Sequence, residues 1–348
     1  MKKICMIVPN ANVKGGIASV VNGYKGSKLE KDYEIIYVES YIDTSKLAKL
    51  IKAFCAYFRF AEILLFDKPD IIHIHSSFGP AFFRKLPFIY MAHFARKPII
   101  NHIHGSEFDK LYTDAGERKQ KLVRKTWEKC DRFIVLSDEW KESFSVVIPE
   151  EKMDVIENYS EIKAFNPEKP LTNTVLFLGA VNEMKGCFDM PEVIRLVSKN
   201  NPEVRMIVAG SGETEKTAEI AKEKCVADRF VFPGWVRNDE KDRLLREADI
   251  FFLPSYTEGM PMSVLDAMGY GLPIVTTNVG GIPKIVKNGV NGYMLTPGDC
   301  EGFANAISEI LSDSNKRKAF GKCSFEIAEN AYSLEKHIEK IEKIYETF

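Results

Sequence analysis

The chain has 348 residues, of which 45% are hydrophobic and 28% charged. This length exceeds what one hydrophobic core usually organises, so we expect two domains, and the composition excludes a disordered or fibrous chain. The 48 Lys and Arg residues nearly balance the 49 Asp and Glu residues, which leaves a net charge of -1. This balance argues against a dedicated nucleic-acid-binding protein, which would be basic overall.

The cysteines and the apolar segments indicate where the protein works. The seven cysteines lie far apart and form no CxxC pair, which favours reduced thiols over a disulfide framework or zinc site, and so a cytosolic compartment. The apolar run at 4–8 is too short for a signal peptide and is expected to be the first strand. Charged residues interrupt the longest apolar region, 47–66, so the sequence predicts no membrane-spanning helix.

Short β-rich runs alternate with longer helical segments along the chain, as in a buried parallel sheet built from βαβ units. A helix is expected across 47–66. A polar, proline-bearing stretch at 166–170 interrupts the alternation and is expected to be a linker. The expected strands are 4–8, 35–38, 71–75, 99–104 and 133–136 before this linker, and 175–178, 205–209, 230–232, 250–253 and 274–277 after it.

This alternation predicts an α/β protein with two doubly wound, Rossmann-like, parallel-sheet domains, 1–165 and 166–330, that face each other across a cleft. Residues 1–165 hold 26 basic and 22 acidic side chains, so the first domain is the more basic one. In such sheets ligands bind beyond the carboxyl ends of the strands. The loops that follow strands are therefore expected to hold the functional residues.

The most informative loop follows the strand at 250–253 and contains Glu258-Gly259-Met260-Pro261. A helix is expected to begin after Pro261, which suits the start of a helix because it has no N–H to leave unbonded, and to contain Asp266. Free amides at the start of this helix, with Gly259 permitting a close approach, predict an anion site suited to a diphosphate. Glu258 and Asp266 would flank that site, although each could instead be an ordinary surface acid.

Two further loops follow strands in the second domain. Lys185 could neutralise a phosphate as a point charge, or it could be an ordinary solvated lysine. Gly210-Ser211-Gly212 is expected to form a tight turn that lets a nucleotide approach. Glu215 occupies the position where a third glycine would complete a dinucleotide fingerprint, which disfavours a nicotinamide dehydrogenase.

In the first domain, Gly15 and Gly16 follow the first strand with exposed amides, which suits either phosphate contact or a simple turn. Alternating histidines mark two strands, as His73 and His75 and as His102 and His104. No carboxylate lies nearby at a usual metalloenzyme spacing, and core strands tolerate hydrogen-bonded histidines, so we expect no metal site. His104 ends its strand, where a neutral imidazole could hydrogen-bond a substrate hydroxyl.

The segment 46–60 mixes lysines with bulky apolar residues at helical spacing. Together with Phe82-Phe83-Arg84-Lys85 it predicts a surface able to rest on an anionic membrane. The alternative is an amphipathic helix that packs on its own sheet and turns its lysines outward.

These motifs resemble those of the retaining glycosyltransferases of family 4, or glycosyl transferases group 1, in particular the bacterial surface-polysaccharide type. The resemblance spans nearly the whole chain and is strongest at 258–273, where two acids, Glu258 and Asp266, are separated by seven residues. It extends to Gly280-Gly281-Ile282-Pro283 and to 288–293. It implies the two-lobed GT-B fold, with an acceptor-binding domain at 1–165, a nucleotide-sugar-binding domain at 166–330, and a final helix at 331–348 that crosses back.

The resemblance also implies roles for single residues. Glu258 would lie against the transferred sugar, and Asp266 would accept hydrogen bonds from the ribose hydroxyls. Lys185 matches the lysine that neutralises the diphosphate, and His104 matches a histidine near the sugar. The implied donor-binding residues are completed by two glycine loops and the start of the helix: Gly15, Gly16, Gly210, Ser211, Gly259, Met260 and Pro261.

Three positions depart from the family's usual residues: Ala180 stands where Arg is common, and Asp266 and Lys284 stand where Glu is common. Lys185 would therefore neutralise the diphosphate without help from an arginine at position 180. The shorter Asp266 reaches one methylene less far.

The expected activity is retaining transfer of a hexosyl unit from a nucleotide diphosphate sugar, a UDP-sugar favoured over a GDP-sugar, to a hydroxyl of a saccharide or lipid-linked saccharide. No cofactor and no metal are expected, because Lys185 and helix amides can stabilise the leaving diphosphate. The expected location is the cytoplasm, with a peripheral site at the inner face of the cell membrane. Alternatives are a sugar-nucleotide epimerase on the same fold, which needs no acceptor, and a non-catalytic nucleotide-sugar binder, which Ala180 makes plausible.

Overall fold

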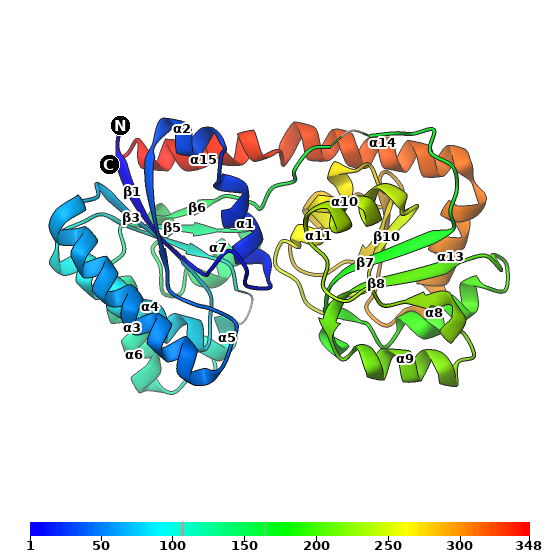
Figure 1. Ribbon diagram of the computed structural model, residues 1–348, viewed down its shortest axis with the longest axis horizontal. Helices are drawn as coiled ribbons and strands as arrows, with labels where there is room; N and C mark the ends of the chain where they lie inside the picture. The colour runs from blue at the N-terminus through cyan, green and yellow to red at the C-terminus, as the bar shows by residue number, and fades with distance from the viewer. Residues whose placement is uncertain (106–107, 164) are drawn as a thin grey trace. The chain divides into compact units, whose positions relative to one another are not determined.

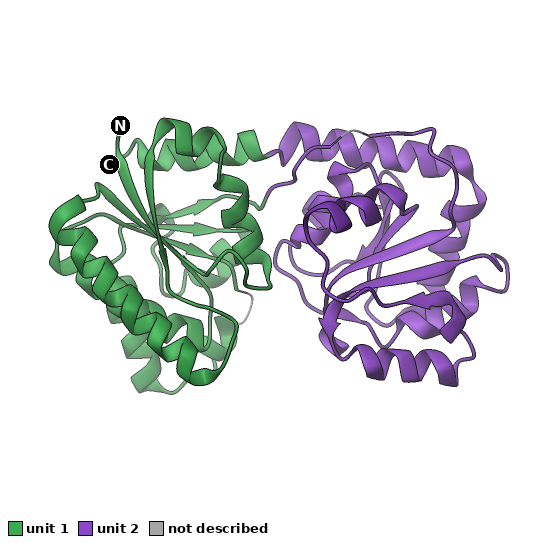
Figure 2. Ribbon diagram, viewed as in Figure 1, with its two compact units in different colours: residues 1–158, 334–348 green, residues 159–333 purple. Residues whose placement is uncertain are grey.

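The structure is a computed structural model that describes residues 1–105, 108–163 and 165–348. The chain forms two compact units (Figures 1 and 2). Unit 1 contains residues 1–158 and 334–348, and unit 2 contains residues 159–333. Each unit is built on a six-stranded parallel sheet with flanking helices, which confirms the predicted fold class. Within the described residues, no helix is both long enough and apolar enough to cross a membrane.

The sheet of unit 1 has the strand order β2-β1-β3-β4-β5-β6. Its strands are β1 (Lys3–Val8), β2 (Glu34–Glu39), β3 (Ile71–Ser76), β4 (Ile99–Ile103), β5 (Arg132–Val135) and β6 (Met153–Val155). Its helices are α1 (Gly16–Tyr24), α2 (Lys28–Asp32), α3 (Lys46–Glu62), α4 (Pro80–Phe94), α5 (Phe108–Leu111), α6 (Glu117–Trp127), α7 (Asp138–Phe144) and α15 (Leu334–Tyr345). The π-helical turn Ile63–Asp67 continues α3, and Glu150–Lys152 forms a 3-10 turn.

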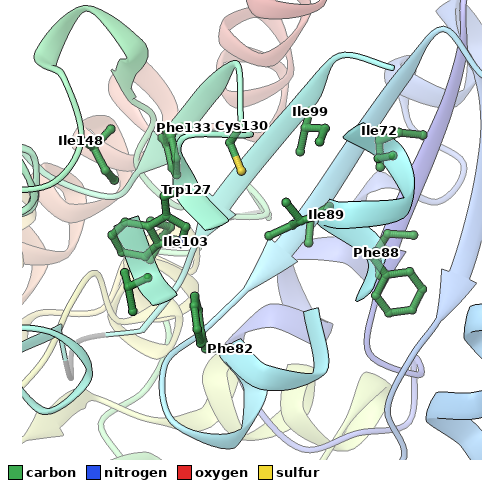
Figure 3. Close-up of a cluster of buried hydrophobic side chains, with 14 of the residues drawn as sticks. Ile72, Phe82, Phe88, Ile89, Ile99, Ile103, Trp127, Cys130, Phe133 and Ile148 are labelled. Carbon is green, nitrogen blue, oxygen red and sulfur yellow. The ribbon is translucent and has the colours of Figure 1, made fainter. Parts of the chain in front are cut away.

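Aromatic and branched side chains from the sheet and its helices form the core of unit 1 (Figure 3). Phe82 and Phe88 of α4, Trp127 of α6 and Phe133 of β5 are all buried there. The helix α15 joins this unit through buried polar contacts as well, because the Tyr345 hydroxyl lies 2.6 Å from His73 Nδ1.

The sheet of unit 2 has the strand order β12-β11-β10-β7-β8-β9. Its strands are β7 (Thr174–Val181), β8 (Arg205–Gly212), β9 (Phe230–Val231), β10 (Ile250–Leu253), β11 (Ile274–Thr277) and β12 (Gly292–Leu295). Its helices are α8 (Met190–Val197), α9 (Thr214–Glu223), α10 (Asn238–Glu247), α11 (Met262–Gly269), α12 (Ile282–Ile285), α13 (Cys300–Ser312) and α14 (Ser314–Ala331), with 3-10 turns at Glu183–Lys185 and Ala227–Arg229.

The strand order of unit 2 reverses between β7 and β10, which pair side by side in parallel. From β7 the chain proceeds outward to β8 and β9, and from β10 it proceeds in the opposite direction to β11 and β12. The loops that leave β7 and β10 therefore diverge at the carboxyl edge of the sheet. A crevice at such a switch point is where open α/β sheets bind ligands.

Candidate active site

Lys185 and Glu258 meet at the switch point of unit 2. Lys185 ends the 3-10 turn that follows β7, and Glu258 lies in the loop that follows β10. Lys185 Nζ lies 2.6 Å from Glu258 Oε1. The Glu258 side chain is 7% exposed and that of Lys185 is 29% exposed, so the ammonium remains open to a ligand while the carboxylate is largely enclosed.

Ser255 also hydrogen-bonds this carboxylate oxygen of Glu258. Its Oγ donates to Glu258 Oε1 at 2.7 Å, and Ser255 itself is fully buried. Thr277, at the end of β11, donates through Oγ1 to the Ser255 carbonyl at 2.7 Å. Within the described part of the chain, no hydrogen bond is found for Glu258 Oε2, so the second oxygen is available to a substrate hydroxyl.

The two loops are tied to each other through their backbones. The Tyr256 amide donates to the Met184 carbonyl at 2.9 Å. Gly186 adopts a left-handed conformation with φ +68° and packs so closely on the Pro254 carbonyl that a Cβ there would lie 2.1 Å from its oxygen. A glycine is therefore required at 186 for both reasons, and the Lys185 loop cannot shift independently of the Glu258 loop.

A third loop, which follows β11, contacts the backbone of Glu258 and Gly259. The Gly281 amide donates to the Gly259 carbonyl at 2.7 Å. Gly280, with φ +54°, approaches the Glu258 carbonyl so closely that a Cβ would lie 1.9 Å from its oxygen. The glycine pair after β11 thus fixes the backbone that carries Glu258.

Helix α11 begins directly after this loop. Pro261 is its N-cap residue and Met262 its first helical residue, so the helix starts after Pro261 as the sequence predicts. Met260 is buried beneath the loop. The first amides of a helix have no intrahelical acceptor and attract anions, and here they lie next to Glu258 in the chain.

Asp266 does not contact Glu258 or Lys185 but forms a separate ion pair. Its Oδ2 lies 2.7 Å from Nζ of Lys241, a residue of α10. Burial raises the pKa of Asp266, while Lys241 counteracts that rise. The pKa of Lys241 is raised because its attraction to Asp266 outweighs the effect of burial. Nothing in the sequence indicated that Lys241 contacts Asp266, because the two residues lie in different helices.

Gly210 and Ser211 do not form the predicted turn. The pairing of β7 with β8 continues to the register Val181↔Gly212, so both residues are part of a strand. A Cβ at Gly210 would lie 1.8 Å from the Gly179 carbonyl oxygen, which explains the glycine by strand packing rather than by nucleotide approach. Ala180 pairs with Ser211 near the same edge and is exposed.

Gly15 and Gly16 lie at the start of α1 in unit 1. Gly15 is the N-cap residue with φ +138°, a conformation that favours glycine. Both glycines are exposed, and no heavy atom lies within 4 Å of a Cβ built at either position. Close packing therefore does not explain them, and their amides are accessible from solvent.

His104 belongs to a stack of imidazoles in unit 1. Its ring lies 4.0 Å from that of His102 and 5.1 Å from that of His75, and its Nε2 is 2.9 Å from His75 Nδ1. Burial, reinforced by nearby positive groups, lowers the pKa of His104 to about 3. The imidazole is therefore neutral near pH 7 and can donate or accept a hydrogen bond.

The stack brings nitrogens of His73, His75 and His102 within 4.8 Å of one another, which raises the question of a metal site. His73 and His75 are each hydrogen-bonded through Nδ1, as expected of core histidines, but among the described residues neither nitrogen of His102 has a hydrogen-bond partner, nor does Nε2 of His73 or His75. The rings are inclined by only 16° to 34° and their centroids are 4.5 to 5.5 Å apart. The lone pairs of such stacked rings run side by side, whereas a metal needs them to converge at about 2 Å.

Comparisons with known proteins agree with this geometry. The family described as Glycosyl transferases group 1 matches residues 158–326, and Glycosyltransferase Family 4 matches residues 18–159. The UDP-Gal:alpha-D-GlcNAc-diphosphoundecaprenol alpha-1,3-galactosyltransferase of Escherichia coli is 26% identical over 97% of this chain and 90% of its own length.

Two solved structures show the same fold over the whole chain. Sucrose-phosphate synthase from Thermosynechococcus elongatus has a TM-score of 0.80 at 16% identity, covering 100% of this chain and 99% of that chain. Anabaena HepE, solved in complex with UDP and glucose, has a TM-score of 0.76 at 16% identity and full coverage of both chains. The chain is therefore a member of glycosyltransferase family 4, the retaining GT-B enzymes that transfer a sugar from a nucleotide sugar.

Proposed function

We propose that the protein transfers a hexosyl unit from a UDP-sugar, with retention, to a hydroxyl of a saccharide or lipid-linked saccharide during the synthesis of a surface polysaccharide. The observation that carries this proposal is the Lys185–Glu258 pair, which lies at the switch point of unit 2 with Nζ and Oε1 2.6 Å apart. An ammonium and a carboxylate beside the start of a helix supply the charges that departure of a nucleoside diphosphate requires.

In this proposal the donor diphosphate binds beside Lys185 and the first amides of α11. When a diphosphate approaches, the Lys185 ammonium exchanges part of its contact with Glu258 for the phosphate oxygens. As the bond to the sugar breaks, these positive groups stabilise the charge that develops on the leaving group. No covalent nucleophile is assigned, and the departing phosphate receives the proton of the acceptor hydroxyl on the same face of the sugar.

Glu258 then acts on the sugar rather than on the phosphate. Ser255 and Lys185 occupy its Oε1, and its Oε2 remains to accept a hydrogen bond from a hydroxyl of the transferred sugar. Asp266 accepts the ribose hydroxyls, with its carboxylate kept ionised by Lys241. Gly259, Met260 and Pro261 line the phosphate side of the site.

The remaining assignments come from the family resemblance. Gly15 and Gly16 are proposed to contact the donor phosphate with their accessible amides, and His104 is proposed to hydrogen-bond the transferred sugar as a neutral imidazole. Gly210 and Ser211 remain proposed donor contacts, although strand packing already accounts for the glycine.

Two similarities support the choice of donor and acceptor. The Escherichia coli relative is named for UDP-Gal as the donor and a GlcNAc on diphosphoundecaprenol as the acceptor, and HepE was solved in complex with UDP and glucose. We extend both features to this chain as a UDP-sugar donor and a saccharide acceptor carried on a lipid diphosphate. In this proposal the enzyme works in the cytoplasm, at the inner face of the cell membrane.

A donor screen followed by product analysis tests the proposal. UDP-, GDP- and ADP-sugars are compared by thermal shift, and the best donor is incubated with saccharides on polyprenyl diphosphate, with Glu258→Gln as the control for contaminating transferase. We expect stabilisation by a UDP-sugar. We also expect an α-linked product that the variant forms roughly a hundredfold more slowly.

Two outcomes would contradict the proposal. Interconversion of the nucleotide sugar without any acceptor would identify an epimerase. Tight donor binding with neither transfer nor hydrolysis across the acceptor panel would identify a non-catalytic binding protein. This is the alternative that Ala180 makes plausible, because Ala180 stands where an arginine is common in the family.

A further inference from the structure

His75 of β3 and His104, which directly follows β4, are joined by a side-chain hydrogen bond in unit 1. His75 Nδ1 lies 2.9 Å from His104 Nε2. The ring planes are inclined by 19° and the ring centroids are 5.1 Å apart. Because the two nitrogens are so much closer than the centroids, this pair of rings meets edge to edge and nearly in one plane. This is the direction in which the lone pair of an imidazole nitrogen accepts an N–H.

The sheet of unit 1 fixes where the two rings lie. The His104 amide donates to the carbonyl of Ser76, the last residue of β3, at 2.9 Å. His75 is 1% exposed and pairs in register with His102 of β4. His75 therefore presents a rigid, buried ring to His104.

Both imidazoles are neutral, so only one of them donates in this bond. Burial, with smaller effects from other histidines and Lys85, lowers the pKa of His75 well below its ordinary value and that of His104 to about 3. Lys85 and Phe82 were expected on a lipid-facing surface, but both are buried, and Lys85 Nζ donates to the Ser40 hydroxyl at 2.8 Å. Since a neutral imidazole has one N–H and one lone pair, one ring donates and the other accepts.

The second nitrogen of His75 distinguishes the two possible arrangements. If His104 donates, His75 carries its own proton on Nε2, whereas if His75 donates, its Nε2 is an unprotonated acceptor. This Nε2 is buried and has no hydrogen-bond partner among the described residues. Proteins leave a buried N–H unpaired less often than they leave a buried acceptor under-satisfied. The structure therefore favours donation from His75 Nδ1 to His104 Nε2.

This arrangement determines what His104 can offer to a ligand. With Nε2 accepting from His75, the proton of the neutral His104 ring lies on Nδ1. No hydrogen bond is found for His104 Nδ1 within the described part of the chain, and His104 is partly exposed. The group that remains for a ligand is therefore an N–H donor.

We propose that His75 is a positioning residue that holds His104 in the Nδ1–H tautomer, so that His104 donates to an oxygen of the transferred sugar. The inference rests on the proposed function for the contact between His104 and the sugar, and it deepens that function with a rule of selection. The sugar must present a lone pair to His104, as a hydroxyl or an amide carbonyl does. A protonated amino group at the same place has no lone pair and would be rejected.

Nuclear magnetic resonance of the full chain without donor or acceptor tests the tautomer directly. Proton–nitrogen correlation spectra of isotope-labelled histidines identify which ring nitrogen is protonated, and the signals lost in His104→Gln assign those of His104. We expect His104 to be protonated on Nδ1 in the wild type and to gain the Nε2–H form in His75→Leu. His102→Leu is the matched control, because His102 is also fully buried and its side chain has no hydrogen bond among the described residues. It should leave the His104 tautomer unchanged.

Transfer kinetics test whether this tautomer matters to the reaction. In His75→Leu we expect kcat to fall about tenfold and UDP affinity to stay within about twofold, because UDP lacks the sugar that His104 contacts. His75→Asn places an amide N–H where Nδ1–H was and should recover most of the lost kcat. His102→Leu should keep the wild-type kcat. Equal kcat in wild type and His75→Leu, or no recovery in His75→Asn, would overturn the positioning role.

The two readouts separate this inference from the proposed function. An Nε2–H tautomer of His104 in an active wild type would overturn the inference alone, and so would a tautomer that His75→Leu leaves unchanged. Absence of transfer with every donor would overturn the proposed function and the rule of selection. An Nδ1–H tautomer that is lost in His75→Leu would still support the control of His104 by His75.

Discussion

One carboxylate oxygen of Glu258, Oε1, accepts the two hydrogen bonds that orient this side chain. Oε1 accepts from Lys185 at 2.6 Å and from Ser255 at 2.7 Å, and Ser255 is in turn anchored by Thr277. Two donors on one oxygen restrict the rotation of the carboxylate and leave Oε2 without a hydrogen bond among the described residues. Ser255 is thus a positioning residue, because it reaches the substrate only through Glu258.

Ser255→Ala should therefore impair turnover more than binding. We expect kcat to fall about tenfold and UDP affinity to stay within about twofold, because the lost hydrogen bond orients a group that acts on the sugar. Ser324→Ala is the matched control, since Ser324 is also fully buried in unit 2 and its hydroxyl bonds the Asn291 carbonyl. Equal loss of kcat in both variants, or a loss confined to UDP affinity, would remove Ser255 from this role.

Lys241 governs the protonation of Asp266. Burial raises the pKa of Asp266 and Lys241 opposes that rise, so Lys241→Met should raise the pKa further. A carboxyl accepts two ribose hydroxyls only when it is ionised. As the pH falls, the variant should therefore lose its UDP affinity at a higher pH than the wild type does. Calorimetric titrations of UDP across acidic pH measure this shift, and Lys241→Arg should restore the wild-type profile. Parallel profiles for wild type and Lys241→Met would show that Asp266 does not bind the ribose.

The residues that sequence reasoning identified are those whose role follows from a position after a strand. Lys185 and Glu258 each follow a recognisable apolar strand, and the carboxyl ends of parallel strands meet at one edge. Ser255 received no role in the sequence analysis, although its position just after the strand is a usable signal. Lys241 had none, because its contact with Asp266 depends on how α10 packs beside α11.

At the scale of elements, all ten predicted strands are present, and two strands of the sheets, β6 and β12, were not predicted. β6 is only three residues long and contains an aspartate, Asp154. β12 begins at Gly292, which is the last residue of two Asn-Gly pairs at 288–292 that indicate turns. Both lie at the outer edge of a sheet, where short or turn-like sequences form strands only because a neighbouring strand is already in place.

The loop after β11 positions the site through contacts with the backbone of Glu258 and Gly259. Gly280→Ala would place a Cβ 1.9 Å from the Glu258 carbonyl oxygen, so the loops must separate and Glu258 must move. We expect transfer activity to fall at least tenfold, because a displacement of about 1 Å disrupts catalytic alignment. Gly289→Ala is the matched control, since Gly289 also has a left-handed φ, +74°, but no heavy atom within 4 Å of a Cβ.

Both variants should lose about 1 kcal/mol of unfolding free energy from backbone strain. Only Gly280→Ala should also lose activity, as measured by initial transfer rates at saturating donor. Similar activities of the two variants would show that the contact with the Glu258 backbone does not position the site.

At the scale of the whole molecule, the two units differ in their histidines. All six histidines lie in unit 1, and the structure buries five of them wholly or partly in its stack and beside α15. Burial lowers the pKa of His73 to about 3 and that of His337 to about 4, from an ordinary value of 6.5. The Glu157 carbonyl, 2.7 Å from His337 Nδ1, opposes this decrease in the pKa of His337, but burial outweighs it.

This difference predicts selective acid destabilisation of unit 1. Between the folded pKa values and 6.5 the unfolded chain binds more protons than the folded one, so stability falls as the pH drops below 6.5. The expected slope is about 1.4 kcal/mol per pH unit for each such histidine. Hydrogen exchange between about pH 5 and pH 7, corrected for intrinsic rates, should show this loss in unit 1 peptides and little change in unit 2.

His102→Leu distinguishes the stack from other acid-sensitive groups. Neither nitrogen of His102 has a hydrogen-bond partner among the described residues, so the apolar replacement removes a titrating group without breaking a hydrogen bond. The acid loss of unit 1 should shrink in this variant, whereas His93→Leu, at an exposed position, should leave it unchanged. An undiminished loss in His102→Leu, or an equal loss in unit 2 of the wild type, would show that the buried imidazoles do not control the stability of unit 1.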